Sequence, residues 1–412
     1  MQSPDDVLDA GTLSNPLTDA RMVAAEPNPE DLIYLSLGET WIPPASGLVG
    51  ALGRIPDYAH GYTLSPYGLP ALRRTLRSYI TRTHHLPESG SYDMAVSQAG
   101  TRATMSDFGR LIRTYPGGSC TALVPDPGWD YQGVFAPLGF AIRRYDVTAE
   151  RNWQPDPEQV GRMAGPDTLL VLNCQHNPTG SDWSPQIVSR IIETALDRKA
   201  AILIDDAYYA LHEPGREPTN ALRILHDLTG GSPASPWLAV RTMGKQFRSN
   251  GWGIGAMSAH PDTLAQLAEI AHRRTYGTAL PLQAAMNIWL QDPASDAYLD
   301  DIRKHYAENR KKAARKLADD LGFPDDTVHP GTCTSYMRFQ VPTRFVQDND
   351  EENYRKLCLE AGVLPGRGSM TAPGEKTGSS PNPAYVRIPL GHPWEVLDQA
   401  FERLRKSGLG WV

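Results

Sequence analysis

The chain has 412 residues, of which 40% are hydrophobic, so it can bury a large core and is expected to form two domains. Its formal net charge of −7 argues against binding to nucleic acid or to an anionic membrane surface. It has no apolar run of the roughly 20 residues needed to span a bilayer, no secretory signal pattern and no CxxC pair. We therefore expect a cytoplasmic protein with reduced, buried cysteines and no metal site.

The first half of the chain alternates between strand and helix patterns. Residues 1–30 are polar and predict a mobile arm. A short apolar run follows at 32–37, and a helix with proline in its first turn is expected at 69–80. Continuous apolar runs predict strands at 94–97, 121–124, 169–172, 201–204 and 238–240, with helices at 103–115 and 184–198. This alternation is typical of an α/β fold whose central sheet is mainly parallel and flanked by helices.

The pattern changes after Pro281. Two helices are expected at 282–290 and 298–321, and the charges of the second are more typical of a solvated helix face than of a nucleic-acid patch. From about residue 328, short strands and helices mix. The sequence thus predicts a large domain at 49–296 and a smaller α/β domain built from 31–48 and 297–412.

Polar residues follow the ends of two predicted strands. Asn177 begins an Asn-Pro-Thr-Gly segment, which by itself is best interpreted as a turn. Asp205 directly follows the apolar run 201–204, and a buried carboxylate costs several kcal/mol unless it is paired. Tyr208, three residues later, can reach the same cavity. Open α/β sheets build their sites at the carboxyl ends of their strands, so we expect a site here.

Lys245 follows the predicted strand 238–240, and three glycines come after it at 251, 253 and 255. A lysine at the mouth of a buried strand suits a Schiff-base amine, because burial disfavours the charged ammonium form. A nucleotide-binding Gly-Lys loop is excluded, because Gln246 stands where Ser or Thr is needed and Ala239 where glycine is needed. For an isolated lysine, a surface position remains the alternative.

In this order the motifs resemble those of the fold type I pyridoxal-phosphate enzymes, specifically the class I/II aminotransferases. The resemblance extends from about Leu35 to the C-terminus. It is carried by Gly-Leu-Pro-Ala-Leu-Arg at 68–73, Asn-Pro-Thr-Gly at 177–180, Asp-Asp-Ala-Tyr at 205–208, the lysine segment and Val-Arg-Ile at 386–388. The resemblance implies a pyridoxal 5'-phosphate cofactor, interconversion of an amino acid and its 2-oxo acid, and a homodimer with shared active sites.

The resemblance also implies roles for the cofactor ring's neighbours. Lys245 would hold the cofactor as a Schiff base and then move a proton between the substrate's α-carbon and the cofactor. Asp205 would pair with the protonated ring nitrogen. Asn177 and Tyr208 would donate hydrogen bonds to the ring's phenolate oxygen, and Trp129 would stack on the ring.

Further positions match the family's phosphate and carboxylate contacts. The resemblance implies that Gly100, Thr101, Arg102 and Thr242 hold the phosphate, since helix N-terminal amides suit a dianion. Tyr62 and Thr278 would reach the phosphate of the neighbouring subunit, although the spacing from Tyr62 to Gly68 is one residue longer than usual in the family. Gly38 and Arg387 would hold the substrate's α-carboxylate, for which guanidinium offers a bidentate grip.

One position departs from the family pattern. The family has an arginine eight residues after the lysine, where this chain has Gly253. A buried phosphate needs a compensating charge, and we expect Arg248 to supply it in preference to Arg102. The alternative, that both arginines lie on the surface, stays open.

Two further interpretations compete with transamination. An enzyme of the same fold could divert the carbanion to β- or γ-elimination or substitution, to cyclisation or to oxidation. A sensor fused to a DNA-binding domain is disfavoured, because the N-terminal arm is short and acidic and the site residues are present. Trp41, Tyr67 and Arg274 are candidates for the substrate side-chain pocket, and core or surface roles are equally open for them.

Overall fold

The computed structural model describes residues 19, 31–36, 43–88, 90–115, 120–230, 234–277, 279–346, 351–368 and 383–412. Three predicted site positions, Gly38, Trp41 and Thr278, lie outside these residues, as does nearly all of the expected N-terminal arm.

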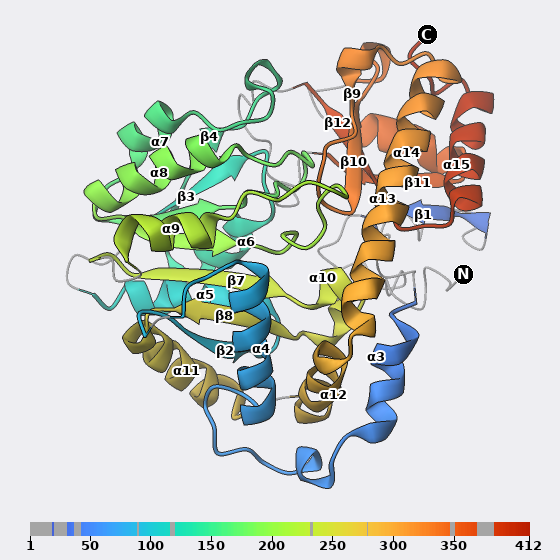
Figure 1. Cartoon of the computed structure of the whole chain (residues 1–412). Helices are drawn as coiled ribbons and strands as arrows, with labels where there is room; N and C mark the ends of the chain where they lie inside the picture. Colours follow the sequence, from blue (N-terminus) through green and yellow to red (C-terminus); the bar gives the residue numbers. More distant parts are fainter. Residues whose placement is uncertain are drawn as a thin grey trace.

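A seven-stranded sheet forms the centre of the large unit (Figure 1). Its spatial order is β2-β8-β7-β6-β5-β3-β4, and only β8 runs antiparallel to its neighbours. The predicted, mainly parallel α/β sheet is therefore confirmed. The strands are β2 (Asp93–Ser97), β3 (Thr121–Asp126), β4 (Ala141–Asp146), β5 (Thr168–Leu172), β6 (Ala201–Asp205), β7 (Trp237–Thr242) and β8 (Gly255–Ala259).

The sequence did not predict β4 or β8. Strand β4 lies at the edge of the sheet and carries two arginines, so it lacks a continuous apolar run. Strand β8 lies inside the sheet, between β2 and β7. It consists mostly of small residues, so it also lacks a continuous run of large apolar side chains.

Helices cover both faces of the large sheet. Successive side chains of a strand point to opposite faces, so each strand contributes apolar side chains to a cluster on either side. Leu170 and Leu172 of β5 pack in one apolar cluster, and Leu169 and Val171 pack in the other. Helices α4 (Pro70–Thr83), α7 (Pro157–Met163), α8 (Pro185–Asp197), α9 (Ala221–Thr229) and α12 (Leu280–Gln291) contribute to the first cluster. Helices α5 (Thr101–Ile112), α6 (Tyr131–Phe135) and α11 (Pro261–Thr275) contribute to the second.

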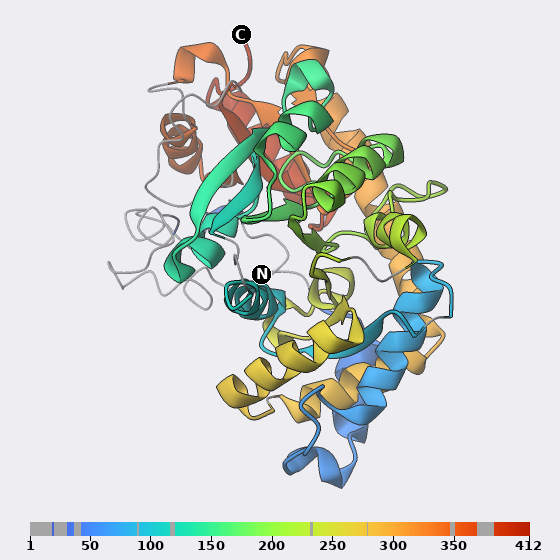
Figure 2. The same cartoon turned by 90° about the vertical axis from the view of Figure 1, so that its left-hand side faces the viewer.

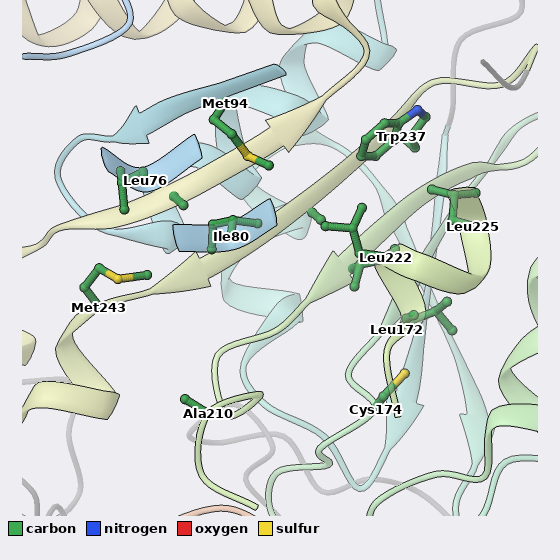
Figure 3. Close-up of a cluster of buried hydrophobic side chains, with 14 of the residues drawn as sticks. Leu76, Ile80, Met94, Leu172, Cys174, Ala210, Leu222, Leu225, Trp237 and Met243 are labelled. Carbon is green, nitrogen blue, oxygen red and sulfur yellow. The ribbon is translucent and has the colours of Figure 1, made fainter. Parts of the chain in front are cut away.

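Figure 3 shows part of the first cluster, in which helices and strands distant in the sequence share one core. Leu76 and Ile80 of α4 and Leu222 and Leu225 of α9 belong to it together with Met94 and Trp237 of the sheet. This packing fixes the strand ends that carry the predicted site residues, because close-packed cores resist displacement.

A second sheet of five strands has the order β1-β11-β12-β10-β9. Its strands are β1 (Ile33–Leu35), β9 (Val328–His329), β10 (Tyr336–Gln340), β11 (Val363–Arg367) and β12 (Tyr385–Pro389). Helices α13 (Ala294–Asp319), α14 (Glu352–Glu360) and α15 (Trp394–Lys406) complete this smaller unit. Figures 1 and 2 show α13 running from α12 of the large unit along the small one.

The two faces of the small sheet differ in character. Met337, Phe339, Val386 and Ile388 pack in the apolar cluster of the small unit, which includes α13, α14 and α15. The residues between them, among them Arg338 and Arg387, point the other way because side chains alternate along a strand. One sheet face is therefore apolar, and the other carries buried polar side chains.

The remaining helix relevant to the site is α10 (Gly244–Phe247), and α3 (Ser46–Ala51) packs against α12 in the first cluster of the large unit. None of the helices within the described part of the chain is both long and apolar enough to cross a membrane. The expected cytoplasmic location stays a prediction. The expectation of four buried cysteines is wrong for Cys120, which is exposed just before β3, whereas Cys174, Cys333 and Cys358 are buried.

Candidate active site

Three neighbouring strands bring the predicted residues to one edge of the large sheet. Asp205 is the last residue of β6, Asn177 lies five residues beyond β5, and Lys245 lies in α10 just after β7. Because β5, β6 and β7 are adjacent and parallel, their carboxyl ends meet at the same edge. The sequence motifs thus become neighbours in space.

Asp205 is a buried carboxylate with two hydrogen-bond donors. The Tyr131 hydroxyl donates to its Oδ2 at 2.8 Å, and the Ala207 amide donates to its Oδ1 at 3.1 Å. Burial raises the pKa of Asp205 to about 6, against the lowering effect of these two hydrogen bonds and of the Lys245 charge. Such a carboxylate gains most from a cationic partner, because ion pairing offsets the cost of its burial.

Lys245 and Tyr208 connect this carboxylate to the small sheet. The Lys245 Nζ lies 5.1 Å from the centroid of the Tyr208 ring. Tyr208 is buried, and its ring packs edge-on against Tyr336 of β10 with centroids 6.3 Å apart. The predicted catalytic residues therefore lie where the large and small units meet.

Arg387 reaches this place from the small sheet. It is buried in β12, and its Nη1 donates to Asn177 Oδ1 at 2.8 Å, while its guanidinium lies 3.9 Å from the centroid of the Tyr336 ring. Its Nε is buried and has no hydrogen-bond partner among the residues described. A carboxylate is the group that a buried guanidinium with a spare donor suits best.

The turn after Asn177 is fixed to the small unit through its backbone. The Gly180 carbonyl accepts hydrogen bonds from the amides of Thr332 and Cys333 at 2.9 and 3.1 Å. A Cβ on Gly331 would lie 2.5 Å from the same carbonyl oxygen, and Gly331 has φ of +70°, so glycine is required there. This close approach holds Asn177 in register with Arg387.

Trp129 and Arg102 extend the site on the other side of Asp205. Trp129 is half-buried, and its ring packs edge-on against that of Tyr131 with centroids 5.3 Å apart. The guanidinium of Arg102 lies 4.3 Å from the centroid of the Trp129 ring and pairs with Asp130 at 3.1 Å. A chain of contacts thus joins Asp205, through Tyr131 and Trp129, to the start of α5.

The residues predicted to hold the phosphate, Gly100, Thr101 and Arg102, lie at the start of α5. Helix N-termini carry amides without intrahelical partners, which favour anions. The Gly100 amide donates to the Gly253 carbonyl at 2.7 Å, and the Thr242 hydroxyl accepts from the Gly244 amide at 3.1 Å. Gly253 has φ of +62°, so a larger residue would be strained, and its Cβ would lie 3.4 Å from the Gly100 nitrogen. The position that departs from the family pattern therefore packs directly on this turn.

The two candidate arginines have different surroundings. The Arg248 guanidinium lies 6.0 Å from the centroid of the Tyr306 ring in α13. Burial, and to a lesser extent the Arg248 charge, lowers the pKa of His392 to about 4. Arg102, in contrast, lies in the first turn of α5 beside Trp129. Because Arg102 lies in the helix turn that would receive the phosphate, we predict that Arg102, in place of Arg248, supplies the compensating charge.

We therefore expect Arg102→Ala to weaken binding of pyridoxal phosphate to the apoprotein about tenfold, and Arg248→Ala to change it less than about threefold. The reason is that a charge-assisted contact contributes about 1.5–3 kcal/mol, which the competing pair with Asp130 reduces. Spectroscopic titration of each apoprotein measures the affinity. The reverse ranking of the two variants would restore Arg248, and no change in either would place the compensating charge elsewhere.

The other predicted positions are less central. Tyr62 is 83% exposed, and its ring packs edge-on against Tyr276 with centroids 5.6 Å apart. Tyr67 lies under the guanidinium of Arg73, 3.9 Å from its ring centroid. Arg274 forms an ion pair with buried Asp107 at 2.8 Å. Tyr67 and Arg274 thus have partners within the large unit that account for their positions.

Sequence reasoning missed two residues that position the site. Asn173 donates from Nδ2 to the Asp205 carbonyl at 2.8 Å, and its Oδ1 accepts from the Asn177 amide at 2.9 Å. Tyr131 holds the Asp205 carboxylate, and burial together with Asp205 raises the pKa of Tyr131, so its hydroxyl stays a donor. Asn173 immediately follows a predicted strand, and this position could have identified it as a site residue. No local sequence pattern identifies Tyr131.

Comparison with known proteins agrees with this geometry. The model of the family "Aminotransferase class I and II" matches residues 60–404. The chain is 25% identical over 386 residues to LL-diaminopimelate aminotransferase of Desulforudis audaxviator, covering 91% of this chain and 90% of that protein. It is 24% identical over 379 residues to aspartate/prephenate aminotransferase of Thermus thermophilus, covering 91% of each.

Solved structures share the fold. The aspartate aminotransferase of Thermus thermophilus with maleate superposes with a TM-score of 0.77 at 22% identity, covering 99% of this chain and 97% of that chain. Substrate-bound BacF from Bacillus subtilis superposes with a TM-score of 0.79 at 20% identity, covering 98% of each. Because the family model matches most of the chain, the predicted relationship is confirmed: the protein belongs to the class I and II aminotransferases, which are pyridoxal-phosphate-dependent transferases.

Proposed function

We propose that this aminotransferase exchanges the amino group of an L-amino acid with a 2-oxo acid, using Lys245 as the proton-transfer group, Asp205 as the partner of the cofactor ring and Arg387 as the carboxylate anchor. The observation that supports this most is the buried Arg387. Its Nη1 donates to Asn177 Oδ1, and its buried Nε has no hydrogen-bond partner among the described residues.

The residues present fit pyridoxal phosphate. Buried Asp205, with its raised pKa, would hold the cofactor's protonated ring nitrogen, because a cation favours the ionised carboxylate. Asn177 and Tyr208 would donate to its phenolate oxygen and Trp129 would lie against the ring. The N-terminus of α5, with Gly100, Thr101 and Arg102, would receive the phosphate together with Thr242.

Bound pyridoxal phosphate supplies the electron sink that stabilises negative charge at the substrate's α-carbon. Arg387 would orient the substrate by gripping its carboxylate with two parallel hydrogen bonds. Lys245 Nζ, as a free amine, would remove the proton from the α-carbon and return it on the cofactor side. Its position over the Tyr208 ring keeps it close to both Asp205 and the small sheet.

A substrate screen tests the proposed reaction. Purified protein is incubated with single amino acids, and the cofactor absorbance and product mass are followed together. A 2-oxo acid formed in step with the amine form of the cofactor supports amino transfer. Release of ammonia, ring closure or oxygen consumption would instead support diversion of the carbanion.

Arg387→Lys is expected to raise the substrate KM about tenfold to hundredfold while leaving the affinity for pyridoxal phosphate unchanged. Lysine keeps the charge but loses the bidentate geometry, which is worth about 1.5–3 kcal/mol for a charged hydrogen bond. Steady-state kinetics and cofactor titration measure the two effects separately. Amines without a carboxylate that react as well as amino acids would show that Arg387 has only a structural role.

We also propose a homodimer with shared active sites. Several large side chains around Tyr62 are exposed: Tyr58 at 61%, Tyr62 at 83%, Leu64 at 89% and Tyr276 at 54%. A cluster of exposed apolar groups is typical of a surface that another chain covers. A native mass of twice the 45.3 kDa chain in sedimentation equilibrium is expected, and a monomer would contradict the proposal.

A further inference from the structure

Arg338 lies beside Arg387 on the polar face of the small sheet. In the antiparallel pair of β10 and β12, Arg338 is directly opposite Arg387, and on its other side it is opposite His329 of β9. Directly opposite residues have Cβ atoms about 4.5–5.5 Å apart and share a face. Arg338 is 1% exposed and Arg387 is 3% exposed. Two buried guanidinium groups therefore extend from neighbouring positions.

Two adjacent buried cations destabilise the folded protein unless an anion lies beside them. Like charges directly opposite each other destabilise a sheet, and an unpaired buried charge costs several kcal/mol. Among the described residues, neither Arg338 nor Arg387 forms an ion pair with a carboxylate. The chain treats its other deeply buried arginines differently: Arg310 pairs with Glu213 at 2.9 Å, and Arg355 pairs with Glu352 at 2.8 Å and with Asp19.

Aromatic rings hold the plane of the Arg338 guanidinium. Its Cζ lies 3.7 Å from the centroid of the Trp153 ring and 4.4 Å from that of the Tyr385 ring. Stacking on aromatic faces stabilises a guanidinium while leaving its N–H edges available. Trp153 and the preceding Asn152 have φ of +58° and +52°, which is unusual for residues other than glycine. The surrounding structure thus maintains a strained segment that places Trp153 against Arg338.

The available edge of Arg338 is the one that suits a carboxylate. Both Nε and Nη2 are buried without a hydrogen-bond partner among the described residues. These two N–H groups point in parallel from one edge of the guanidinium, and this fork matches the two oxygens of a carboxylate. These two buried N–H groups have no partner in the described part of the chain and lie beside Arg387, the predicted contact of the substrate carboxylate. A ligand that accepts hydrogen bonds from them would satisfy both.

His329 adds a third donor in the same row of the sheet. The Trp153 Nε1 donates to His329 Nδ1 at 3.4 Å, so the ring proton of neutral His329 is on Nε2, which is buried without a described partner. Burial, and then the Arg338 charge, lower the pKa of His329 to about 4, so it is neutral at pH 7. Arg338 and His329 thus present N–H donors for which the described part of the chain offers no acceptor.

We propose that Arg338 is a specificity-determining residue that binds a second carboxylate of the substrate, so that the enzyme prefers acidic amino acids and dicarboxylic 2-oxo acids. This inference rests on the proposed function, in which Arg387 binds the α-carboxylate. The cross-strand spacing of the two arginines then suits two carboxylates joined by a short carbon chain.

Calorimetric titration of the holoenzyme with non-reacting acids tests this inference. Succinate and glutarate carry two carboxylates, and butyrate carries one. We expect Arg338→Met to weaken binding of one or both dicarboxylates about tenfold to hundredfold relative to butyrate, because one charged bidentate contact is lost. Arg338→Lys keeps the charge without the fork and is expected to lie between methionine and wild type.

Arg310→Met is the matched control, since Arg310 is equally buried but fully partnered. It is expected to lower the melting temperature of the ligand-free protein and to leave the ratio of dicarboxylate to butyrate affinity unchanged. Arg338→Met is expected to change that ratio with a smaller loss of melting temperature. An unchanged ratio in both Arg338 variants would overturn the inference and make Arg338 a structural contact between Trp153 and Tyr385.

The same titration separates this inference from the proposed function. If no amino acid yields a 2-oxo acid but the affinity ratio still depends on Arg338, amino transfer fails and the anion site stands. If neutral amino acids are converted and the ratio does not depend on Arg338, the specificity inference fails alone.

Discussion

Lys245→Ala is expected to lower turnover by roughly 10⁴-fold or more, the largest effect of any single substitution in the site. The same nitrogen would hold the cofactor and transfer the proton at the α-carbon, so both contributions disappear together. The position of Nζ, 5.1 Å from the Tyr208 ring centroid and near Asp205, matches this dual role.

Single-turnover kinetics measure this loss, and peptide mapping after borohydride reduction shows where the cofactor is attached. Wild-type protein is expected to carry the reduced cofactor on the peptide containing Lys245. Lys304→Ala serves as control, because Lys304 is an exposed helix residue paired with Asp301, and it should retain wild-type turnover. Labelling of any other lysine in the wild type would remove Lys245 from the mechanism.

Asp205→Asn is expected to lower turnover roughly 10²- to 10⁴-fold and yet make the apoprotein more stable at neutral pH. Without the carboxylate, the cofactor's ring nitrogen loses its counter-charge, so its electron sink weakens. The stability gain has a separate origin. Burial raises the pKa of Asp205 from 3.8 to about 6, so the ionised form is disfavoured in the folded apoprotein.

The pH dependence of this gain follows from the direction of the shift. Well below pH 3.8 the carboxyl is protonated in both the folded and unfolded states and contributes no difference in stability. As pH rises to about 6, the unfolded state loses its proton first, so the wild type becomes less stable by about 3 kcal/mol. Asparagine avoids this cost, but it has one acceptor oxygen in place of two, so it loses one of the hydrogen bonds from Tyr131 and Ala207, worth about 1 kcal/mol. A net gain of about 2 kcal/mol is expected.

Urea unfolding of the two apoproteins at pH 7 and pH 4 measures the difference. The variant should be more stable than the wild type at pH 7 and no more stable at pH 4, because the lost hydrogen bond then outweighs the small remaining cost of ionising the carboxyl. Asp206→Asn is the matched control. Asp206 is equally buried, its pKa is raised to about 7 by burial, and Arg241 is its principal counter-charge, so its replacement should leave turnover within a few fold of wild type. If Asp205→Asn retained full turnover, Asp205 would not be the ring's partner.

Much of the fold and of the site's chemistry was predictable from local patterns. The apolar runs of β5, β6 and β7 predicted buried parallel strands, because a strand covered on both faces needs apolar residues at every position. Asn177, Asp205 and Lys245 were identifiable because each follows such a strand. Edge strand β4 and small-residue strand β8 carry no such pattern, and their pairing depends on neighbours distant in the chain.

The sequence by itself determined which chemical groups the site contains: an amine, a buried carboxylate, an amide and a guanidinium, in an order that identified the family. Only the tertiary structure decided their surroundings. It placed Arg248 beside α13 and Arg102 beside Trp129. It also set the register that makes Arg338 the neighbour of Arg387, with no described carboxylate beside either. Cross-strand register and burial arise from contacts between segments far apart in the chain, so no local pattern encodes them.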